Sequence, residues 1–242
     1  MIKTELQLEY TVCQSEEKVP VIVVAAGSSL RMKGVNKQLY EIGGVPVIIR
    51  TLLAFERSDA ISNIVLVVKT EDLFKIQFIC EKYELSKLTD IVCGGNSRQE
   101  SVLKGLERLP KDAEKVLIHD GARPLVSDNI IKSVIDGLSK FSACGCAVKV
   151  KDTIKEIGPD GSILRTVPRE NLVSVQTPQG VKVKEYLEAV KDTDVSRFTD
   201  DLSIMEAKGY SAGTVEGDYK NIKITTAEDL ILAESFLENC NG

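Results

Sequence analysis

The segment after the first apolar run combines small residues with two cations, a combination suited to phosphate binding. Ala25, Ala26 and Gly27 leave room for a ligand near the main chain, and backbone N–H groups in such a turn can face a phosphate. Arg31 and Lys37 follow and could neutralise a triphosphate. The segment has neither the Gly-Lys-Ser/Thr ending of a Walker loop nor a GxGxxG fingerprint. Taken alone, it could also be a plain connection between a strand and a helix.

A second turn contains two glycines and leads into a helical pattern. Gly95 and Asn96 lie where backbone donors and acceptors could contact the edge of a base. Ser97 and Glu100 have the spacing of a capping box, which predicts that a helix begins here. The alternative is a simple glycine turn followed by a capped helix.

The third segment, His119-Asp120-Gly121-Ala122-Arg123-Pro124, ends another apolar run. An aspartate at the carboxyl end of a strand, beside a small residue, can hold Mg²⁺ or a ribose hydroxyl. Arg123, with its backbone restricted by Pro124, could bind a phosphate through two parallel hydrogen bonds. His119 is the only histidine of the chain, but the alternation of the preceding run favours an inward-facing side chain over a catalytic one.

Five further polar residues are candidates, although no local spacing connects them: Thr153, Arg169, Thr177, Thr199 and Lys223. Taken singly, each threonine is typical of a strand or of a helix cap. The arginine and the lysine, taken singly, are typical of surface charges.

The composition is that of an ordinary globular protein and excludes several classes. The chain has 242 residues, of which 43% are hydrophobic and 28% charged, enough for one α/β domain or two small ones. The apolar run at residues 19–26 is too short to cross a bilayer, and no secretion signal precedes it, so we expect a cytoplasmic protein without a membrane partner. The net charge of −5 argues against a nucleic-acid partner, so a polyphosphate ligand would need a local cluster of cations.

The cysteines do not form a recognisable metal or redox motif. No CxxC pair is present, and no spacing with the single histidine fits a zinc site. We therefore expect reduced thiols, with Cys144 and Cys146 on one face of a strand.

Short β-branched runs alternate with longer amphipathic stretches. Strands are predicted at residues 19–26, 64–68, 90–93, 116–119 and 144–150. Helices are predicted at residues 46–57, 71–83, 98–108 and 128–140, the last with Ser127 or Asp128 as its cap. Continuous apolar strands separated by helices predict an α/β fold with a mostly parallel sheet covered on both faces. Ligands of such sheets bind beyond the carboxyl ends of the strands, which directs attention to the loops after Ala26, Cys93 and His119.

The pattern changes after residue 150. Residues 151–157 and 163–167 flank Gly158-Pro159-Asp160-Gly161, a strong turn signal, which predicts a β-hairpin. A two-stranded ribbon is marginal alone, so this arm, at about residues 151–170, is expected to pack against a second subunit.

The remaining chain is predicted to return to the main domain. We expect a helix capped by Thr199 and ending near Gly209, a strand at residues 212–215, the segment 222–224 and a last helix from about Ala227. Residues 1–18 are interpreted as an N-terminal extension, and residues 19–242 as a single domain that carries the arm.

Seven motifs occur in order over nearly the whole chain after residue 19. They are AAGxxxRM…KQ (25–38), GGxxRxxSV (94–102), HDGARP (119–124), DT (152–153), TPQ (177–179), TDD (199–201) and VEG…NIKIT (215–225). Together they resemble the 2-C-methyl-D-erythritol 4-phosphate cytidylyltransferase family of the non-mevalonate isoprenoid pathway.

The resemblance implies a Rossmann-like fold of the nucleotide-diphospho-sugar transferase type and a homodimer that exchanges β-arms. It also implies transfer of CMP from CTP to a sugar-alcohol phosphate, with Mg²⁺ as cofactor. Arg31, Lys37 and Lys223 match the cations that face the triphosphate. Ala25, Ala26, Gly27, Gly95, Asn96, Ser101, Asp120 and Gly121 match the nucleotide site, with Asp120 associated with the metal. Arg123, Thr153, Arg169, Thr177 and Thr199 match the acceptor site.

The chain departs from the family pattern at two positions. Ser29 stands where a second glycine is usual, and Asn36 stands where a proline usually precedes the lysine. We expect an altered affinity for CTP and a more mobile loop, rather than loss of activity. Two alternatives stay open: a ribitol-5-phosphate cytidylyltransferase, and a nucleotide-binding paralogue without catalysis. Ala25-Ala26-Gly27 and HDGARP favour methylerythritol phosphate over ribitol phosphate.

Overall fold

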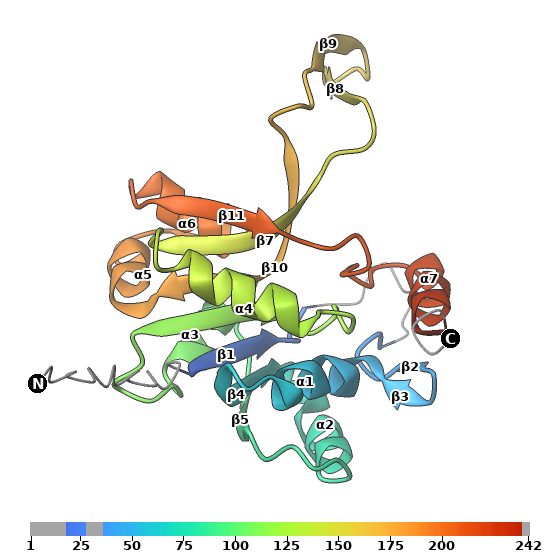
Figure 1. The fold of residues 1–242 in the computed structure, drawn as a ribbon, viewed down its shortest axis with the longest axis vertical. Helices are drawn as coiled ribbons and strands as arrows, with labels where there is room; N and C mark the ends of the chain where they lie inside the picture. Colours follow the sequence, from blue (N-terminus) through green and yellow to red (C-terminus); the bar gives the residue numbers. More distant parts are fainter. Residues whose placement is uncertain (1–17, 28–35, 239–242) are drawn as a thin grey trace, which may run out of the picture.

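A twisted seven-stranded sheet forms the centre of the computed structural model, which describes residues 18–27 and 36–238 (Figure 1). Its order is β11-β7-β10-β6-β1-β4-β5. In chain order the strands are β1 (Val19–Val24), β4 (Ile61–Val68), β5 (Leu88–Cys93), β6 (Lys115–Asp120), β7 (Ala143–Lys149), β10 (Val173–Lys182) and β11 (Ala212–Glu216). Strand β10 is antiparallel to β6 and β7, and every other neighbouring pair is parallel. The prediction of a mostly parallel sheet is confirmed.

Helices cover both faces of the sheet, which explains why its strands are continuous apolar runs. On one face, α1 (Val47–Arg57), α2 (Leu73–Cys80) and α4 (Asp128–Gly137) pack on the same side as Val21 and Val23 of β1. On the other, α3 (Arg98–Leu106), α5 (Val183–Val190) and α6 (Asp201–Ala207) pack on the same side as Ile22 and Val24. Alternate side chains of β1 therefore belong to two different cores, one on each face of the sheet. The packed sheet holds the loops at its edge in place.

A third, smaller core lies beside the sheet. Helix α7 (Ala227–Glu238) contributes Leu230 and Ala233, and the short hairpin β2 (Glu41–Ile42) and β3 (Val45–Pro46) contributes Ile42. Ile224 joins them and brings the segment before α7 against Ala122, whose carbonyl accepts from the Ile224 N–H at 2.8 Å. The 3₁₀ turns Thr70–Asp72 and Val195–Arg197 complete the described elements.

The predicted hairpin forms and projects far from the sheet (Figure 1). Strands β8 (Ile154–Ile157) and β9 (Ile163–Val167) are antiparallel, and Gly161 adopts a φ of +82° in the turn between them. Glycine is needed there because this φ is unfavourable for other residues.

Strand β10 and helix α5 were not anticipated. Pro178 lies within β10, and proline normally argues against a central strand because it has no N–H to donate. The ladder between β10 and β7 is irregular between Val175 and Gln179, so Pro178 sits where the pairing is already interrupted. A central strand can therefore contain Pro178, although proline in a sequence normally argues against a central strand.

One smaller expectation was wrong. Helix α6 is capped by Asp200, whose carboxylate accepts from the Ser203 N–H at 3.0 Å, and not by Thr199. By contrast, Ser97 and Ser127 cap α3 and α4 as predicted.

Several sequence predictions fall partly or wholly outside the described residues: Arg31, Ser29 and nearly all of the 1–18 extension. Within the described part, no helix is both long and apolar enough to cross a membrane. Cys80, Cys93, Cys144 and Cys146 are free thiols, and the last two are buried in the same strand.

Candidate active site

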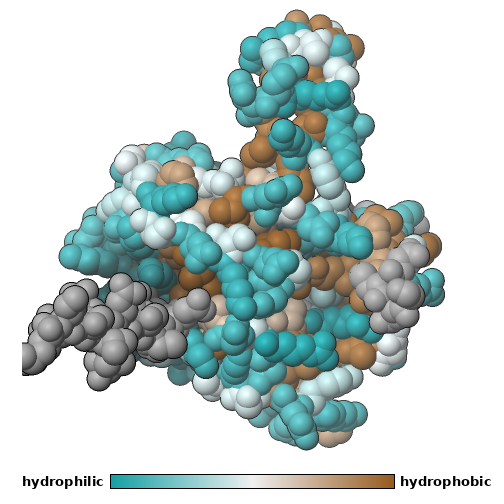
Figure 2. Space-filling view, viewed as in Figure 1, coloured by the Kyte–Doolittle hydropathy of each residue, from teal (hydrophilic) through white to brown (hydrophobic). Residues whose placement is uncertain are grey.

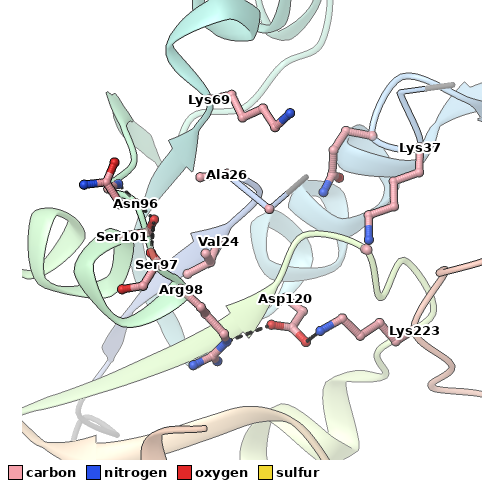
Figure 3. A pocket seen from close by; sticks show the side chains of 14 residues that line it. Val24, Ala26, Lys37, Lys69, Asn96, Ser97, Arg98, Ser101, Asp120 and Lys223 are labelled. Atoms are coloured by element: carbon pink, nitrogen blue, oxygen red, sulfur yellow. Dashed lines mark hydrogen bonds and ion pairs between the residues drawn. The ribbon is translucent and has the colours of Figure 1, made fainter. Parts of the chain in front are cut away.

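The carboxyl ends of β1, β4, β5 and β6 open into one cavity of about 370 Å³, which we call the edge cavity. Parallel strands place their carboxyl ends at the same edge, so loops far apart in sequence meet there. The lining residues are Val24, Ala26, Gly27, Lys37, Gln38, Lys69, Gly95, Asn96, Ser97, Arg98, Ser101, Asp120, Ala122 and Lys223 (Figure 3).

One wall of the edge cavity is the glycine turn, residues 94–97, which the first turn of α3 holds in place. The Gly95 N–H donates to Ser101 Oγ at 3.1 Å, and the Asn96 N–H donates to Glu100 Oε2 at 2.8 Å. Ser97 Oγ in turn accepts from the Glu100 N–H at 3.0 Å. The turn is therefore tied to α3, and its main chain lies at the cavity wall, where it can contact a base edge.

Both glycines of this turn are required by close packing. A Cβ added at Gly94 would lie 2.4 Å from the Ala26 Cβ, and one at Gly95 would lie 2.4 Å from the Glu100 Cβ. The first contact joins the glycine turn to the loop after β1, so the two expected nucleotide-binding segments touch.

The opposite end of the edge cavity carries cations. Lys37 donates from Nζ to the Ile224 carbonyl at 3.1 Å, and Lys223 Nζ lies 2.8 Å from Asp120 Oδ2. Asn36 Oδ1 accepts from the Gln38 N–H at 3.1 Å, so the asparagine closes its own turn beside Lys37. The Asn36 side chain thus restrains the backbone next to Lys37.

Asp120 sits at the centre of a cluster of positive charge. Its Oδ1 lies 3.2 Å from Arg98 Nε, and its Oδ2 lies near Lys223 and 3.8 Å from Arg123 Nε. Its backbone N–H donates to Thr177 Oγ1 at 3.0 Å. Burial alone would raise the pKa of the carboxyl, but Arg98, Lys223 and Arg123 hold it well below its usual range. Asp120 is therefore a fixed negative charge.

His119 points away from the edge cavity. It is fully buried against the Phe55 ring, with centroids 4.9 Å apart, and it hydrogen-bonds to Thr177 and to the Arg123 carbonyl, each at 3.1 Å. Burial lowers its pKa to about 3, which keeps the ring neutral. The inward orientation predicted from the alternation is correct.

The edge cavity brings together Ala26, Gly27, Lys37, Gly95, Asn96, Ser101, Asp120 and Lys223 from the predicted site. Other predicted residues lie outside its lining. Ala25 and Gly121 lie beneath it, where the Ala25 N–H donates to the Val67 carbonyl and the Gly121 N–H to that of Val24. Arg123 donates to the Asn221 carbonyl at 2.7 Å, and Thr177 is buried.

Three predicted acceptor-site residues are exposed and separate from this lining. Thr199 precedes α6, while Thr153 and Arg169 lie at the base of the arm, where Arg169 donates to the Lys151 carbonyl. Within this chain they do not join the edge cavity.

Sequence reasoning missed four polar residues of the lining, Gln38, Lys69, Ser97 and Arg98, and the apolar residues Val24 and Ala122. Lys69 directly follows β4, so the rule that ligands bind beyond strand ends could have found it. Arg98 is the arginine of the GGxxRxxSV motif, but its position in the sequence alone indicates no role. Its Nη1 lies 2.7 Å from Asp201 Oδ2, a contact across 103 residues that no local pattern reveals.

The arrangement is suited to binding a polyanion. The described lining residues include four cations (Lys37, Lys69, Arg98 and Lys223) and a single carboxylate, that of Asp120. The described residues hold no cluster of three or more His, Cys, Asp or Glu side chains able to bind a metal by themselves. One buried carboxylate does fit Mg²⁺ that is bound mainly through phosphate oxygens, as is usual for nucleotide-bound Mg²⁺.

Comparison with known proteins gives consistent matches. The model of the family described as 2-C-methyl-D-erythritol 4-phosphate cytidylyltransferase, IspD, matches residues 19–239. The 2-C-methyl-D-erythritol 4-phosphate cytidylyltransferase of Clostridium novyi is 47% identical over 222 residues, covering 90% of this chain and 96% of that protein.

Solved structures agree with the sequence matches. The 4-diphosphocytidyl-2C-methyl-D-erythritol synthase of Anaerococcus prevotii has a TM-score of 0.80 at 33% identity, over 92% of this chain and 97% of that one. The 2-C-methyl-D-erythritol 4-phosphate cytidylyltransferase of Thermus thermophilus has a TM-score of 0.73 at 28% identity, over 91% and 99%. The similarity therefore extends over the sheet and the loops at its edge.

Proposed function

The chain belongs to the 2-C-methyl-D-erythritol 4-phosphate cytidylyltransferase family, and from that premise we propose that it transfers CMP from CTP to 2-C-methyl-D-erythritol 4-phosphate, giving 4-CDP-2-C-methyl-D-erythritol and pyrophosphate. One observation carries the proposal: the glycine turn and the cations Lys37 and Lys223 line the same cavity. A base-reading wall facing a phosphate-binding wall is what a nucleoside triphosphate requires.

The nucleotide is proposed to lie across the edge cavity with its two ends on opposite walls. Gly95, Asn96 and Ser101 contact the base and ribose, and the loop Ala25-Ala26-Gly27 lies against the nucleotide. Lys37 and Lys223, together with Arg31, bind the triphosphate. We add Lys69, which lines the same cavity, to this set.

In the proposed reaction an acceptor phosphate oxygen attacks the α-phosphorus of CTP, and the bond from that phosphorus to the α,β-bridging oxygen breaks, so that pyrophosphate leaves. The acceptor phosphate is already ionised, so no general base or protein nucleophile is required. The barrier comes from repulsion between two anions and from charge that grows on the α-phosphate, and fixed cations lower it. Lys37 and Lys223 are proposed to stabilise this charge, since both already have fixed partners at the cavity wall.

Asp120 is proposed as the protein ligand of a Mg²⁺ ion held chiefly by the CTP phosphates. When bound, Mg²⁺ neutralises phosphate charge and polarises the phosphoryl group. Asp120 suits this role because its pKa is held below the usual range, so it stays ionised. Gly121 shapes the backbone beside it.

The acceptor site is proposed to form between two copies of the chain. Arg123, Thr177 and Thr199 would act from the protomer that binds CTP, and Thr153 and Arg169 from the arm of its partner. Ile157, Ile163 and Leu164 of the arm are 62–65% exposed, and a second copy would cover this apolar surface. No nucleic-acid or membrane partner is proposed, and the cytoplasmic location stays a prediction.

Pyrophosphate release tests the proposal with CTP or UTP and with either 2-C-methyl-D-erythritol 4-phosphate or ribitol 5-phosphate. We expect turnover with CTP and the methylerythritol acceptor. Turnover with ribitol 5-phosphate alone would assign ribitol 5-phosphate as the acceptor. CTP binding without pyrophosphate release in the presence of either acceptor would identify a non-catalytic paralogue.

A further inference from the structure

Four charges of alternating sign run from the interior to the edge cavity: Asp201, Arg98, Asp120 and Lys223. Asp201 Oδ2 lies 2.7 Å from Arg98 Nη1, and Arg98 Nε lies 3.2 Å from Asp120 Oδ1. Asp120 Oδ2 lies 2.8 Å from Lys223 Nζ. Figure 3 shows the last three side chains in line along one side of the cavity.

The inner end of this row cannot move without breaking several buried bonds. The Asp201 side chain is fully buried, and its second oxygen, Oδ1, accepts from the Tyr186 hydroxyl at 2.8 Å. Its backbone N–H donates to Gln179 Oε1 at 2.9 Å. Asp201 is therefore a rigid anchor supplied by α6, β10 and α5 together.

The second member of the row is tied to the glycine turn. Arg98 is the first residue of α3, and the same helical turn supplies Ser101 and Glu100, which bind the main chain of Gly95 and Asn96. The glycine turn and the Arg98 backbone are thus parts of one hydrogen-bonded unit. A shift of this turn on binding a base would move Arg98, and through it Asp120.

The position of Arg98 requires a guanidinium group and not merely a positive charge. Its side chain is one-fifth exposed and contacts two carboxylates through different nitrogen atoms. Burial would lower its pKa, but Asp201 and Asp120 raise it well above the usual range. A lysine keeps the charge but lacks the planar fork that holds two carboxylates in fixed positions.

We propose that Arg98, anchored by Asp201, is a positioning residue that couples base recognition at the glycine turn to the placement of Asp120 and Lys223 at the phosphates. This inference rests on the proposed function, because it assigns cytosine to the glycine turn. Arg98 and Asp201 act through Asp120 and not on the reacting atoms. Because of this coupling, cytosine at the glycine turn raises the rate of turnover as well as the affinity for the nucleotide.

Asp201→Asn is the first test. Asparagine has the same shape and keeps an oxygen for the Tyr186 hydroxyl, but it removes the charge that anchors Arg98. We expect kcat with CTP to fall by about tenfold or more while KM for CTP changes by less than about threefold. The kcat ratio of CTP to UTP should fall by at least about threefold, because the base no longer improves the alignment of the phosphates.

Arg98→Lys serves as a second variant, since it keeps all four charges and decides the matter if Asp201→Asn does not fold. It should show the same split between kcat and KM. The matched control is Arg108→Gln, which removes an arginine just beyond α3 whose ion pair with Asp90 is long, at 3.7 Å, and exposed. Its kcat should stay within about twofold of wild type.

The outcomes separate the possible failures. Folded variants, judged by their melting temperatures, that keep the wild-type kcat and the wild-type CTP to UTP ratio would overturn the inference. A loss of kcat equal for CTP and UTP would also overturn it, because it indicates support of the site without coupling. Absence of turnover in the wild-type chain would instead contradict the proposed function.

Discussion

The region beneath the edge cavity and the arm are built on opposite principles. Beneath the cavity, Asp201 and His119 are fully buried, and each has polar partners within the same chain. On the arm, Ile163 and Leu164 are more than 60% exposed, and Figure 2 shows apolar surface along the projecting hairpin. The first region has its polar partners within one chain, whereas the second exposes apolar surface that we propose a second copy covers.

This difference separates two kinds of functional requirement. Binding of a nucleotide needs donors and charges held in fixed positions, which a sheet edge with a buried network supplies. The arm has no core of its own, and a two-stranded ribbon gains stability from contact with another surface. Changes beneath the cavity should therefore alter chemistry or folding, and changes on the arm should alter assembly.

Lys37→Ala should produce the largest effect. Removing one cation from the triphosphate site costs about 2–4 kcal/mol in the barrier, which predicts at least about a hundredfold loss of turnover. The fold should stay intact, because Lys37 is at the cavity wall. Steady-state pyrophosphate release measures the effect, with Lys75→Ala on the exposed face of α2 as control. Near-normal turnover would remove Lys37 from the mechanism.

Gly94→Ala should disturb the contact between the two nucleotide-binding segments. The new Cβ would meet the Ala26 Cβ at 2.4 Å, and such overpacking costs about 1–3 kcal/mol of unfolding free energy. Urea unfolding and CTP binding should both weaken. The double variant Ala26→Gly/Gly94→Ala removes the closest atom, the Ala26 Cβ, and should recover part of the lost unfolding free energy and CTP affinity. If nothing is recovered, the contact with Ala26 is not the source of the strain.

His119 should make stability depend on pH. Its pKa is about 3 in the folded protein, below the ordinary value of 6.5, so the folded state favours the neutral ring. As the pH falls from 6.5 towards 3, the unfolded chain binds the proton first, and the unfolding free energy falls by up to about 1.4 kcal/mol per pH unit.

His119→Gln tests this assignment, because it removes the single histidine of the chain. The unfolding free energy, measured with urea at pH 6, 5 and 4, should change less steeply with pH in this variant than in wild type, by up to about 1.4 kcal/mol per pH unit. An unchanged slope would assign the acid sensitivity to other groups.

Ile163→Glu on the arm should have the smallest effect on the protomer itself. Ile163 is 65% exposed, so the unfolding free energy of the protomer should change by less than about 0.5 kcal/mol. The oligomeric state, measured by light scattering, should shift from dimer to monomer. Phe78→Glu, at a residue that is 61% exposed on α2, is the control and should leave assembly unchanged. A dimer that survives Ile163→Glu would contradict the proposed role of the arm.

Much of the fold was predictable because local chemistry and fold agree. The apolar runs of β1 and β6, the caps Ser97 and Ser127, and the turn at Gly161 each follow from a single segment. The loops at the carboxyl ends of the strands were predictable for the same reason, since a parallel sheet gathers them at one edge.

The features that the sequence did not predict depend on contacts between segments far apart in the chain. Strand β10 contains Pro178, and only its irregular pairing with β7 makes the residue acceptable there. The contact of Arg98 with Asp201 joins α3 to α6, so neither residue alone indicates a role. The proposed contribution of the arm depends on a second copy of the chain, and a single chain shows only the exposed apolar surface of the arm.

A structure of the protein with CTP and Mg²⁺ tests the central claim most directly. The account predicts cytosine against Gly95 and Asn96, with the triphosphate between Lys37 and Lys223. A nucleotide bound elsewhere would contradict it, for example in the cleft of about 540 Å³ between α1 and α7 that Leu53 and Phe236 line.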